Sequence, residues 1–135
     1  MTAGYSGTPL PTKLVIKEAS VLAVINDPGY FLDLVAPLPG GVVVRRTARG
    51  KADTVVFFTA KRRQLERRIG SLRRLIEPDG GIWICWPKRS SSVPTDITGD
   101  VVREVVLSLG LVDVKVAAID ETWSGLRIVI RRENR

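Results

Sequence analysis

Pro78-Asp79-Gly80-Gly81-Ile82-Trp83-Ile84-Cys85-Trp86-Pro87-Lys88 is the stretch that decides the fold. Its opening, Pro-Asp-Gly, is turn chemistry, and five consecutive apolar residues follow from Ile82 to Trp86. A short apolar run bounded by turn residues is typical of a strand that is buried on both faces of a parallel sheet. Ligands of open α/β sheets bind beyond the carboxyl ends of such strands. The loop that follows Trp86 is therefore the first place to look for a functional site.

The segment before this strand has the period of a helix. Between Ala60 and Ile76, apolar residues recur four, three and four positions apart, at Leu65, Ile69, Leu72 and Ile76. This spacing gathers them on one face of a helix, with the charged residues on the opposite face. We expect Pro78-Asp79-Gly80 to end the helix and to start the central strand.

A second helix is predicted from Ile97 to Leu109, with Gly110 at its end. Thr95 or Asp96 is expected to cap its N-terminus, because a side-chain oxygen can accept a hydrogen bond from the first free backbone N–H groups. Its expected apolar face comprises Val101, Val105 and either Val102 or Leu109.

The remaining segments complete an α/β pattern. Predicted strands are Ser20 to Ile25, Val42 to Arg45, Thr54 to Phe58, Val112 to Ile119 and Leu126 to Ile130, and a short helix is predicted from Tyr30 to Val35. The last two strands are close in sequence and should form an antiparallel hairpin. The sequence predicts one α/β domain over residues 14–135, with a mostly parallel sheet, preceded by an extended arm over residues 1–13.

Composition limits the chemistry that the chain can perform. The chain has 135 residues, a net charge of +7, one cysteine and no histidine. Without histidine there is no Ser-His-Asp or Cys-His arrangement, and we expect no metal site. No apolar run approaches the roughly 20 residues that span a bilayer, and the start lacks the pattern of a secretion signal, so we expect a cytoplasmic protein with no membrane partner. The positive charge favours anionic partners.

One order of elements in the chain resembles a known family. An aspartate precedes an apolar strand, an amphipathic helix follows, and a second apolar strand comes after Leu75-Ile76-Glu77-Pro78-Asp79-Gly80-Gly81. This order resembles the second half of the class I S-adenosylmethionine-dependent methyltransferases, over about Asp53 to Arg132. The resemblance implies a three-layer Rossmann-like sandwich whose last two strands are antiparallel.

Nearly the whole chain also resembles a narrower group. Three segments look like those of a family of small bacterial proteins of unknown function. They are Gly4-Tyr5-Ser6-Gly7-Thr8-Pro9-Leu10, Trp86-Pro87-Lys88 and Asp120-Glu121-Thr122-Trp123-Ser124-Gly125-Leu126. That resemblance implies no established activity.

The methyltransferase resemblance implies a cofactor site that this chain departs from. The family holds S-adenosylmethionine with a glycine-rich loop after the first strand and an acidic residue at the end of the second. Here the loop is Asn26-Asp27-Pro28-Gly29-Tyr30, and the second strand ends in Arg45-Arg46. The chain also lacks the helix and strand that normally precede the fourth strand. We therefore expect no cofactor and a regulatory or binding role, and the alternative is a divergent S-adenosylmethionine-dependent methyltransferase.

Candidate ligand-binding residues follow the central strand: Lys88, Ser90, Ser91, Ser92 and Thr95. Hydroxyl groups and free N–H groups at a helix N-terminus, beside a lysine, favour a phosphate or carboxylate. The simpler interpretation is a helix cap within a solvated serine loop.

A second set of residues is expected to approach a pocket at the same edge of the sheet. Its members follow the other strands or lie in the terminal hairpin: Asn26, Asp27, Gly29, Tyr30, Thr59, Trp86, Asp120, Glu121 and Trp123. No catalytic residue is assigned among them. The simpler interpretations are that Trp123 covers the end of the sheet and that Trp83 and Cys85 belong to the core.

The basic face from Lys61 to Arg74 is a third candidate, for nucleic acid. No aromatic residues alternate with its charges and no recognition motif accompanies it, so a solvated helix face is the simpler interpretation. We expect a small anion or a protein as partner, and the terminal hairpin leaves a homodimer open.

Overall fold

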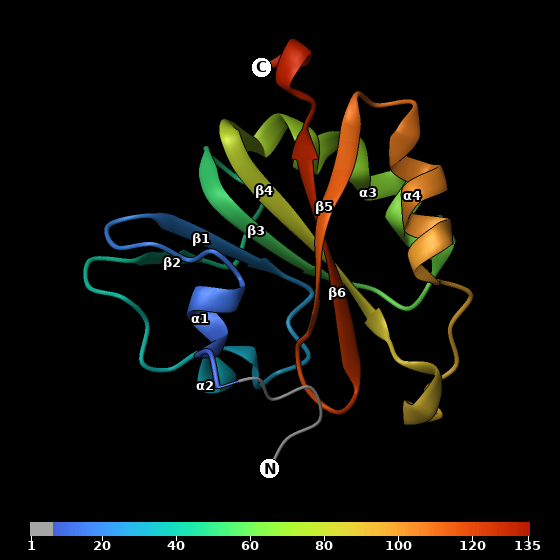
Figure 1. Cartoon of the computed structure of the whole chain (residues 1–135), viewed down its shortest axis with the longest axis horizontal. Coiled ribbons are helices and arrows are strands. Elements are labelled where there is room, and N and C mark those ends of the chain that lie inside the picture. Colours follow the sequence, from blue (N-terminus) through green and yellow to red (C-terminus); the bar gives the residue numbers. More distant parts are fainter. Residues whose placement is uncertain (1–6) are drawn as a thin grey trace.

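A six-stranded sheet in the order β2-β1-β3-β4-β6-β5 forms the centre of the protein (Figure 1). The computed structural model describes residues 7–135. The strands are β1 (Val21–Ile25), β2 (Val43–Arg45), β3 (Ala52–Phe58), β4 (Ile76–Pro87), β5 (Leu111–Ala118) and β6 (Trp123–Ile130). The first four are parallel to one another, and β6 is antiparallel to both β4 and β5. This topology confirms the predicted α/β sandwich with a C-terminal antiparallel hairpin.

Helices cover both faces of the sheet. They are α1 (Leu10–Lys13), α2 (Phe31–Leu34), α3 (Arg62–Leu75) and α4 (Gly99–Leu107), and short 3-10 turns occupy Arg89–Ser91 and Arg132–Asn134. The apolar sides of α3 and α4 pack on one face with Val55, Ile82 and Ile84. On the other face, Phe31 of α2 and the chain after α1 pack on Val24 and Trp83. Figure 1 shows α1 and α2 in front of the sheet and α3 behind it.

The central strand is as buried as its sequence predicts. Ile82, Trp83, Ile84 and Cys85 of β4 are all 0% exposed, and β3 and β6 flank them on the two sides. Alternate residues enter the two apolar cores, because successive side chains of a strand point to opposite faces.

The Pro78-Asp79-Gly80 turn differs from the prediction, because these residues lie within β4 instead of before it. Ile76 pairs with Ala52, and Gly81 pairs with Thr54, so residues 77–80 form a bulge opposite Asp53 alone. A Cβ atom on Gly80 would lie 2.5 Å from the main-chain oxygen of Asp53. A residue without a side chain is therefore required where the bulge returns to the sheet.

Two further expectations were wrong in detail. The described part of the arm is not all extended, since Leu10–Lys13 form one helical turn with Pro11 buried beneath it. Helix α4 begins two residues later than predicted, and Thr98 caps it by accepting a 3.2 Å hydrogen bond from the N–H of Val101. Val102 and Val106 are its buried residues, whereas Val101 is only partly buried, because the later start turns the helix face. The first six residues of the arm lie outside the described residues.

Candidate functional site

The loop after β1 is organised by the side chain of Asp27. Its Oδ1 oxygen accepts hydrogen bonds from the N–H groups of Gly29 (2.8 Å) and Phe31 (3.2 Å). Its Oδ2 oxygen lies 3.4 Å from the Nη1 atom of Arg46, just beyond β2. Asp27 therefore uses both carboxylate oxygens to join the ends of two strands, and it occupies N–H groups that would otherwise face a ligand.

Tyr30 and Trp123 close the same edge from opposite sides. The indole Nε1 of Trp123 donates a 3.0 Å hydrogen bond to the hydroxyl oxygen of Tyr30. Asp120 accepts 2.8 Å hydrogen bonds from the N–H groups of Thr122 and Trp123, which fixes the hairpin turn. Burial raises the pKa of Tyr30, and hydrogen bonding to Asp120 raises that pKa further. The hydroxyl is thus held neutral between a donor and a carboxylate.

Aromatic rings extend this contact into the core. The Trp123 ring meets Phe58 edge to face at 5.0 Å between centroids, and Phe58 meets Phe31 in the same way at 5.4 Å. The structure therefore joins the loop after β1, the end of β3 and the start of β6. That Asp27, Gly29, Tyr30, Asp120 and Trp123 line a ligand pocket stays a prediction.

Other members of the predicted pocket lie elsewhere. Thr59 is buried, and its hydroxyl donates to Gln64 Oε1 at 2.5 Å, which fixes the entrance to α3. Asn26 is exposed in a left-handed conformation, with φ at 58°. Glu121 is exposed at the hairpin tip. Trp86 packs against the other core, on the face of α3 and α4. The nine residues therefore do not form one pocket.

The loop after β4 uses much of its hydroxyl chemistry internally. The hydroxyl of Ser91 donates to the Lys88 oxygen at 2.6 Å and accepts from the N–H of Val93 at 3.2 Å. The hydroxyl of Thr95 donates to the Ala60 oxygen at 2.7 Å and accepts from the N–H of Ile97.

A cavity of about 380 Å³ lies between this loop and the start of α4. Ser92 and Thr95 line it, whereas Lys88, Ser90 and Ser91 do not. Arg89, which belongs to the same predicted cationic cluster, lines it too, and so does Thr98, which was not singled out from the sequence. Thr98, followed by Asp100 in the first turn, also fits the sequence pattern of a helix N-cap. The neighbouring Thr95-Asp96 pair fits that pattern as well and was preferred in the prediction.

Asp96 has a different role from the predicted one. Its Oδ1 oxygen accepts a 2.7 Å hydrogen bond from the N–H of Arg62, the first residue of α3. It therefore satisfies a free N–H group of another helix. The two residues are 34 positions apart in the chain, and this contact was not predicted from the sequence.

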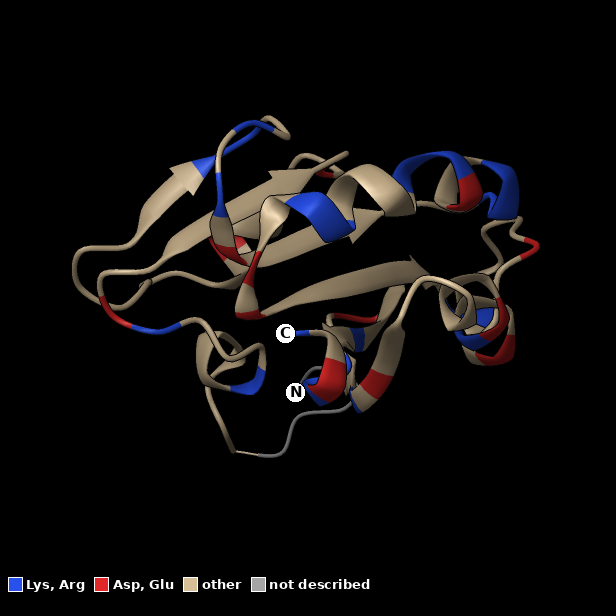
Figure 2. Ribbon diagram, turned by 90° about the horizontal axis from the view of Figure 1, so that it is seen from above, with Lys and Arg blue, Asp and Glu red and all other residues tan. Residues whose placement is uncertain are grey.

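The basic face of α3 is partly engaged by the protein itself. Arg62 pairs with Glu66 and Glu104, each at 3.2 Å. Arg73 donates a 2.6 Å hydrogen bond to the Leu109 oxygen, and the Arg68 guanidinium lies 5.7 Å from the centre of the Phe57 ring. Figure 2 shows where lysine and arginine occur along the ribbon, α3 included. Fewer charges of this helix are available to a polyanion than its sequence indicates.

The described residues 7–135 contain neither a candidate metal site nor a candidate membrane-spanning helix. No group of three or more histidine, cysteine, aspartate and glutamate side chains there could hold a metal ion. No helix in this range combines the length and apolar character needed to cross a bilayer.

Comparison with solved structures identifies the architecture. A SAM-dependent methyltransferase from Aquifex aeolicus superposes with a TM-score of 0.67 at 11% identity, over 89% of each chain. The chain has the fold of the class I methyltransferases. Fibrillarin from Aeropyrum pernix, solved with natively bound S-adenosyl-L-methionine, gives a TM-score of 0.59 at 13% identity over 93% of this chain and 70% of that one. Magnesium protoporphyrin IX methyltransferase from Synechocystis PCC 6803, with bound SAM, gives a TM-score of 0.55 at 10% identity over 90% of this chain and 74% of that one.

Sequence similarity adds nothing to this likeness. No protein family model matches the chain, and no curated protein matches it. The methyltransferase-like fold is therefore established by structure alone.

Within this fold, β2 is the last strand on its side of the described sheet and is three residues long. Arg45 ends it and Arg46 follows, where the family resemblance implies an acid.

Proposed function

We propose that this methyltransferase-like domain does not use S-adenosylmethionine and acts as a binding module for a small anion or a protein. The observation that carries the proposal is the double use of Asp27. Its carboxylate takes the N–H groups of Gly29 and Phe31 and pairs with Arg46. A cofactor in the family position would have to displace these contacts.

Electrostatics supports the same proposal. S-adenosylmethionine carries a sulfonium cation and ribose hydroxyls that an acidic side chain would hold. Arg45 and Arg46 stand at the end of β2 instead, and a guanidinium can only donate hydrogen bonds. The end of β2 therefore carries positive charge where the resemblance implies an acid, and the nearby carboxylate of Asp27 is already paired with Arg46.

The cavity beside α4 is the place where this module would hold an anion. Arg89, Ser92 and Gly99 line it at the N-terminal end of a nine-residue helix. Helix N-termini present free N–H groups and a partial positive charge, which favour phosphate or carboxylate. Ser92 adopts a left-handed conformation with φ at 63°, which bends the loop around the cavity.

Calorimetric titration with S-adenosylmethionine and S-adenosylhomocysteine tests the proposal. We expect no binding at about millimolar ligand, which corresponds to a binding free energy weaker than about −4 kcal/mol. Micromolar binding would overturn the proposal. A parallel titration with inorganic phosphate should show binding that Arg89→Ala weakens and Arg63→Ala does not, since Arg63 lies on the exposed side of α3.

A divergent methyltransferase is the second candidate. The observation that favours it is chain length. The superposition with the Aquifex aeolicus methyltransferase covers 89% of that chain and 89% of this one. A fold of this extent is thus compatible with a protein described as SAM-dependent. Micromolar binding of S-adenosylmethionine to the unaltered chain would select this candidate.

A further inference from the structure

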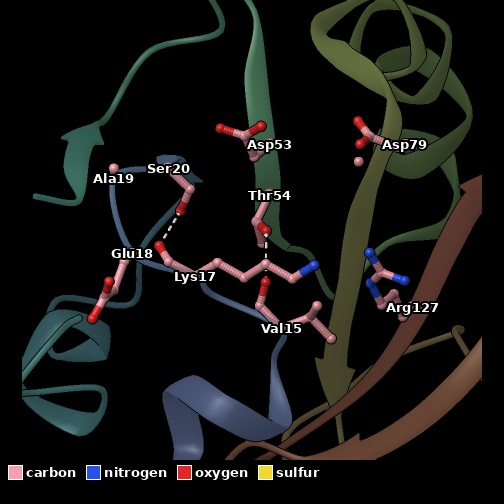
Figure 3. Close-up of a pocket in the computed structure, with 10 residues that line it drawn as sticks. Val15, Lys17, Glu18, Ala19, Ser20, Asp53, Thr54, Asp79 and Arg127 are labelled. Atoms are coloured by element: carbon pink, nitrogen blue, oxygen red, sulfur yellow. Dashed lines mark hydrogen bonds between the residues drawn. The ribbon is translucent and has the colours of Figure 1, made fainter. Parts of the chain in front are cut away.

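A second cavity, of about 220 Å³, opens at the opposite edge of the sheet, where the parallel strands begin (Figure 3). Its walls come from the chain before β1, the start of β3, the bulge of β4 and the middle of β6. The residues that matter here are Lys17, Ser20, Asp53, Thr54, Asp79 and Arg127. This edge lies away from the Tyr30–Trp123 contact and from the cavity beside α4.

Arg127 reaches this cavity because Gly81 has no side chain. Arg127 stands opposite Trp83 in the antiparallel β4–β6 pair, two residues along from Gly81. A Cβ atom on Gly81 would lie 2.7 Å from Nε of Arg127 and 2.8 Å from its Cζ and Nη2 atoms. The guanidinium therefore occupies the space above Gly81, beside Thr54, which pairs with Gly81 on the other side.

Arg127 is half-buried, and the buried part of its guanidinium has no partner within residues 7–135. Its Nε atom is buried and has no hydrogen-bond partner among the described residues, and no carboxylate in that part of the chain lies within ion-pair distance. Burial, followed by repulsion from Arg135, lowers the pKa of Arg127. Arg127 also lines the cavity, so an acceptor that enters it would meet the positive charge of this side chain.

The charges around the cavity are separated by sign. Figure 3 shows the Lys17 side chain extended toward Arg127, with Asp53 on β3 and Asp79 on β4 at another side of the cavity and with Glu18 turned away from both. Asp53 Oδ2 accepts a 2.8 Å hydrogen bond from the N–H of Val21, which fixes that side chain. Asp79 is exposed and makes no hydrogen bond or ion pair within residues 7–135. The lining thus includes two cations, Lys17 and Arg127, and three carboxylates, those of Glu18, Asp53 and Asp79.

We propose that this cavity binds a small amino-carboxylate, a zwitterion such as a free α-amino acid. The carboxylate lies against the guanidinium of Arg127, whose fork of donors matches its two oxygens, with Lys17 as the second cation. The ammonium group lies against Asp79, and the hydroxyl of Thr54 borders the space between them. A phosphate dianion suits the site less well, because Asp53 and Asp79 would repel it.

The size of the cavity limits the ligand. At about 30 Å³ for each water molecule in the liquid, 220 Å³ corresponds to roughly seven waters. This volume accommodates a small or medium-sized amino acid, whereas a nucleotide would extend out of the cavity into solvent.

The test is a titration of the full chain with the proteinogenic α-amino acids, followed by amide shifts in NMR spectra. We expect at least one to bind, with the largest shifts at Ser20, Thr54 and Gly80, which line the cavity. For alanine, the matched analogues are propionate, which lacks the amino group, and ethylamine, which lacks the carboxylate. Each should bind about tenfold or more weakly, because a charged hydrogen bond contributes about 1.5–3 kcal/mol.

Variants assign the two ends of the ligand. Arg127→Gln should abolish carboxylate binding, and Asp79→Asn should remove the preference for alanine over propionate. The control is Arg131→Gln, which removes a second buried Nε atom that has no partner but lies outside the cavity. Circular dichroism shows whether each variant is folded, and the analogue series in the unaltered chain tests the proposal even if Arg127→Gln does not fold.

Three outcomes would overturn the inference. These are no binding by any amino acid at about 10 mM, where even a millimolar Kd gives near-saturation, equal binding of alanine and propionate, or amide shifts at Ser20, Thr54 and Gly80 that inorganic phosphate produces at lower concentration than any amino acid. Amide shifts assign each titration to one site, since Ser92 and Gly99 line the cavity beside α4 instead. The same assignment applies to S-adenosylmethionine, which carries an α-amino acid end, so the failure of one proposal is distinguished from the failure of the other.

Discussion

The indole nitrogen of Trp83 donates a 2.8 Å hydrogen bond to the main-chain oxygen of Leu14, 69 residues earlier in the chain. Both residues are 0% exposed. The bond joins the central strand to the segment after α1, on the face that α3 and α4 do not cover. A buried main-chain oxygen needs a partner, so this contact specifies how the N-terminal segment lies on the sheet.

Trp83→Phe should therefore destabilise the protein by about 2 kcal/mol, because the Leu14 oxygen loses its donor in a buried site. Urea unfolding followed by circular dichroism measures the change. The matched control is Trp86→Phe, since Trp86 is partly exposed and its indole makes no hydrogen bond within residues 7–135. If both variants lose the same stability, ring volume rather than the hydrogen bond is responsible.

Asp96→Ala should lower the free energy of unfolding by about 1 kcal/mol, because Asp96 accepts the hydrogen bond of the first N–H group of α3. Asp96→Asn should retain most of the stability, since its amide oxygen can still accept that bond. The control is Asp100→Ala, whose side chain is 95% exposed and pairs only with Arg103. A loss in Asp100→Ala as large as that in Asp96→Ala would contradict this interpretation.

Most of the fold could be predicted from local patterns. The buried run of β4 and the spacing of Leu65, Ile69 and Leu72 depend only on neighbouring residues, and both predictions were confirmed. The start of α4 was missed because Thr95, Asp96 and Thr98 are all good caps. The choice depends on Ala60 and Arg62, which engage the first two from another part of the chain.

The candidate sites were less predictable, because they depend on long-range contacts. Tyr30 and Trp123 meet in a hydrogen bond at the edge where the parallel strands end, and whether Asp27 and these two residues serve a ligand stays a prediction. Sequence position could not show that Asp27 takes its own loop's N–H groups. Arg127 has no distinctive sequence pattern at all, and its exposure to a cavity depends on the absence of a side chain at Gly81 across the sheet.

Cys85 should be inert in the native protein. It is 0% exposed, and burial, followed by repulsion from Asp120, raises the pKa of its thiol far above the ordinary value. The reactive thiolate is therefore absent near neutral pH. A chromogenic disulfide reagent should not react with the folded chain. In denaturant it should react with one thiol per chain, because the chain has a single cysteine. Stoichiometric reaction of the folded protein within minutes would show that β4 opens readily.

Tyr30 should make stability depend on alkaline pH. Burial and the hydrogen bond to Asp120 raise its pKa, so the folded state holds the phenolic proton more tightly than the unfolded state. The corresponding stability is fully present below the unfolded pKa of about 10 and is lost as pH rises through the folded pKa.

Urea unfolding between about pH 8 and pH 11 should therefore show a steeper loss of stability in the unaltered chain than in Tyr30→Phe. Tyr30→Phe also removes the acceptor for the Trp123 indole, so its stability at neutral pH is expected to be lower and the slope is the informative quantity. Equal slopes in the unaltered chain and in Tyr30→Phe would mean that the Tyr30 hydroxyl is not held between Trp123 and Asp120 in solution.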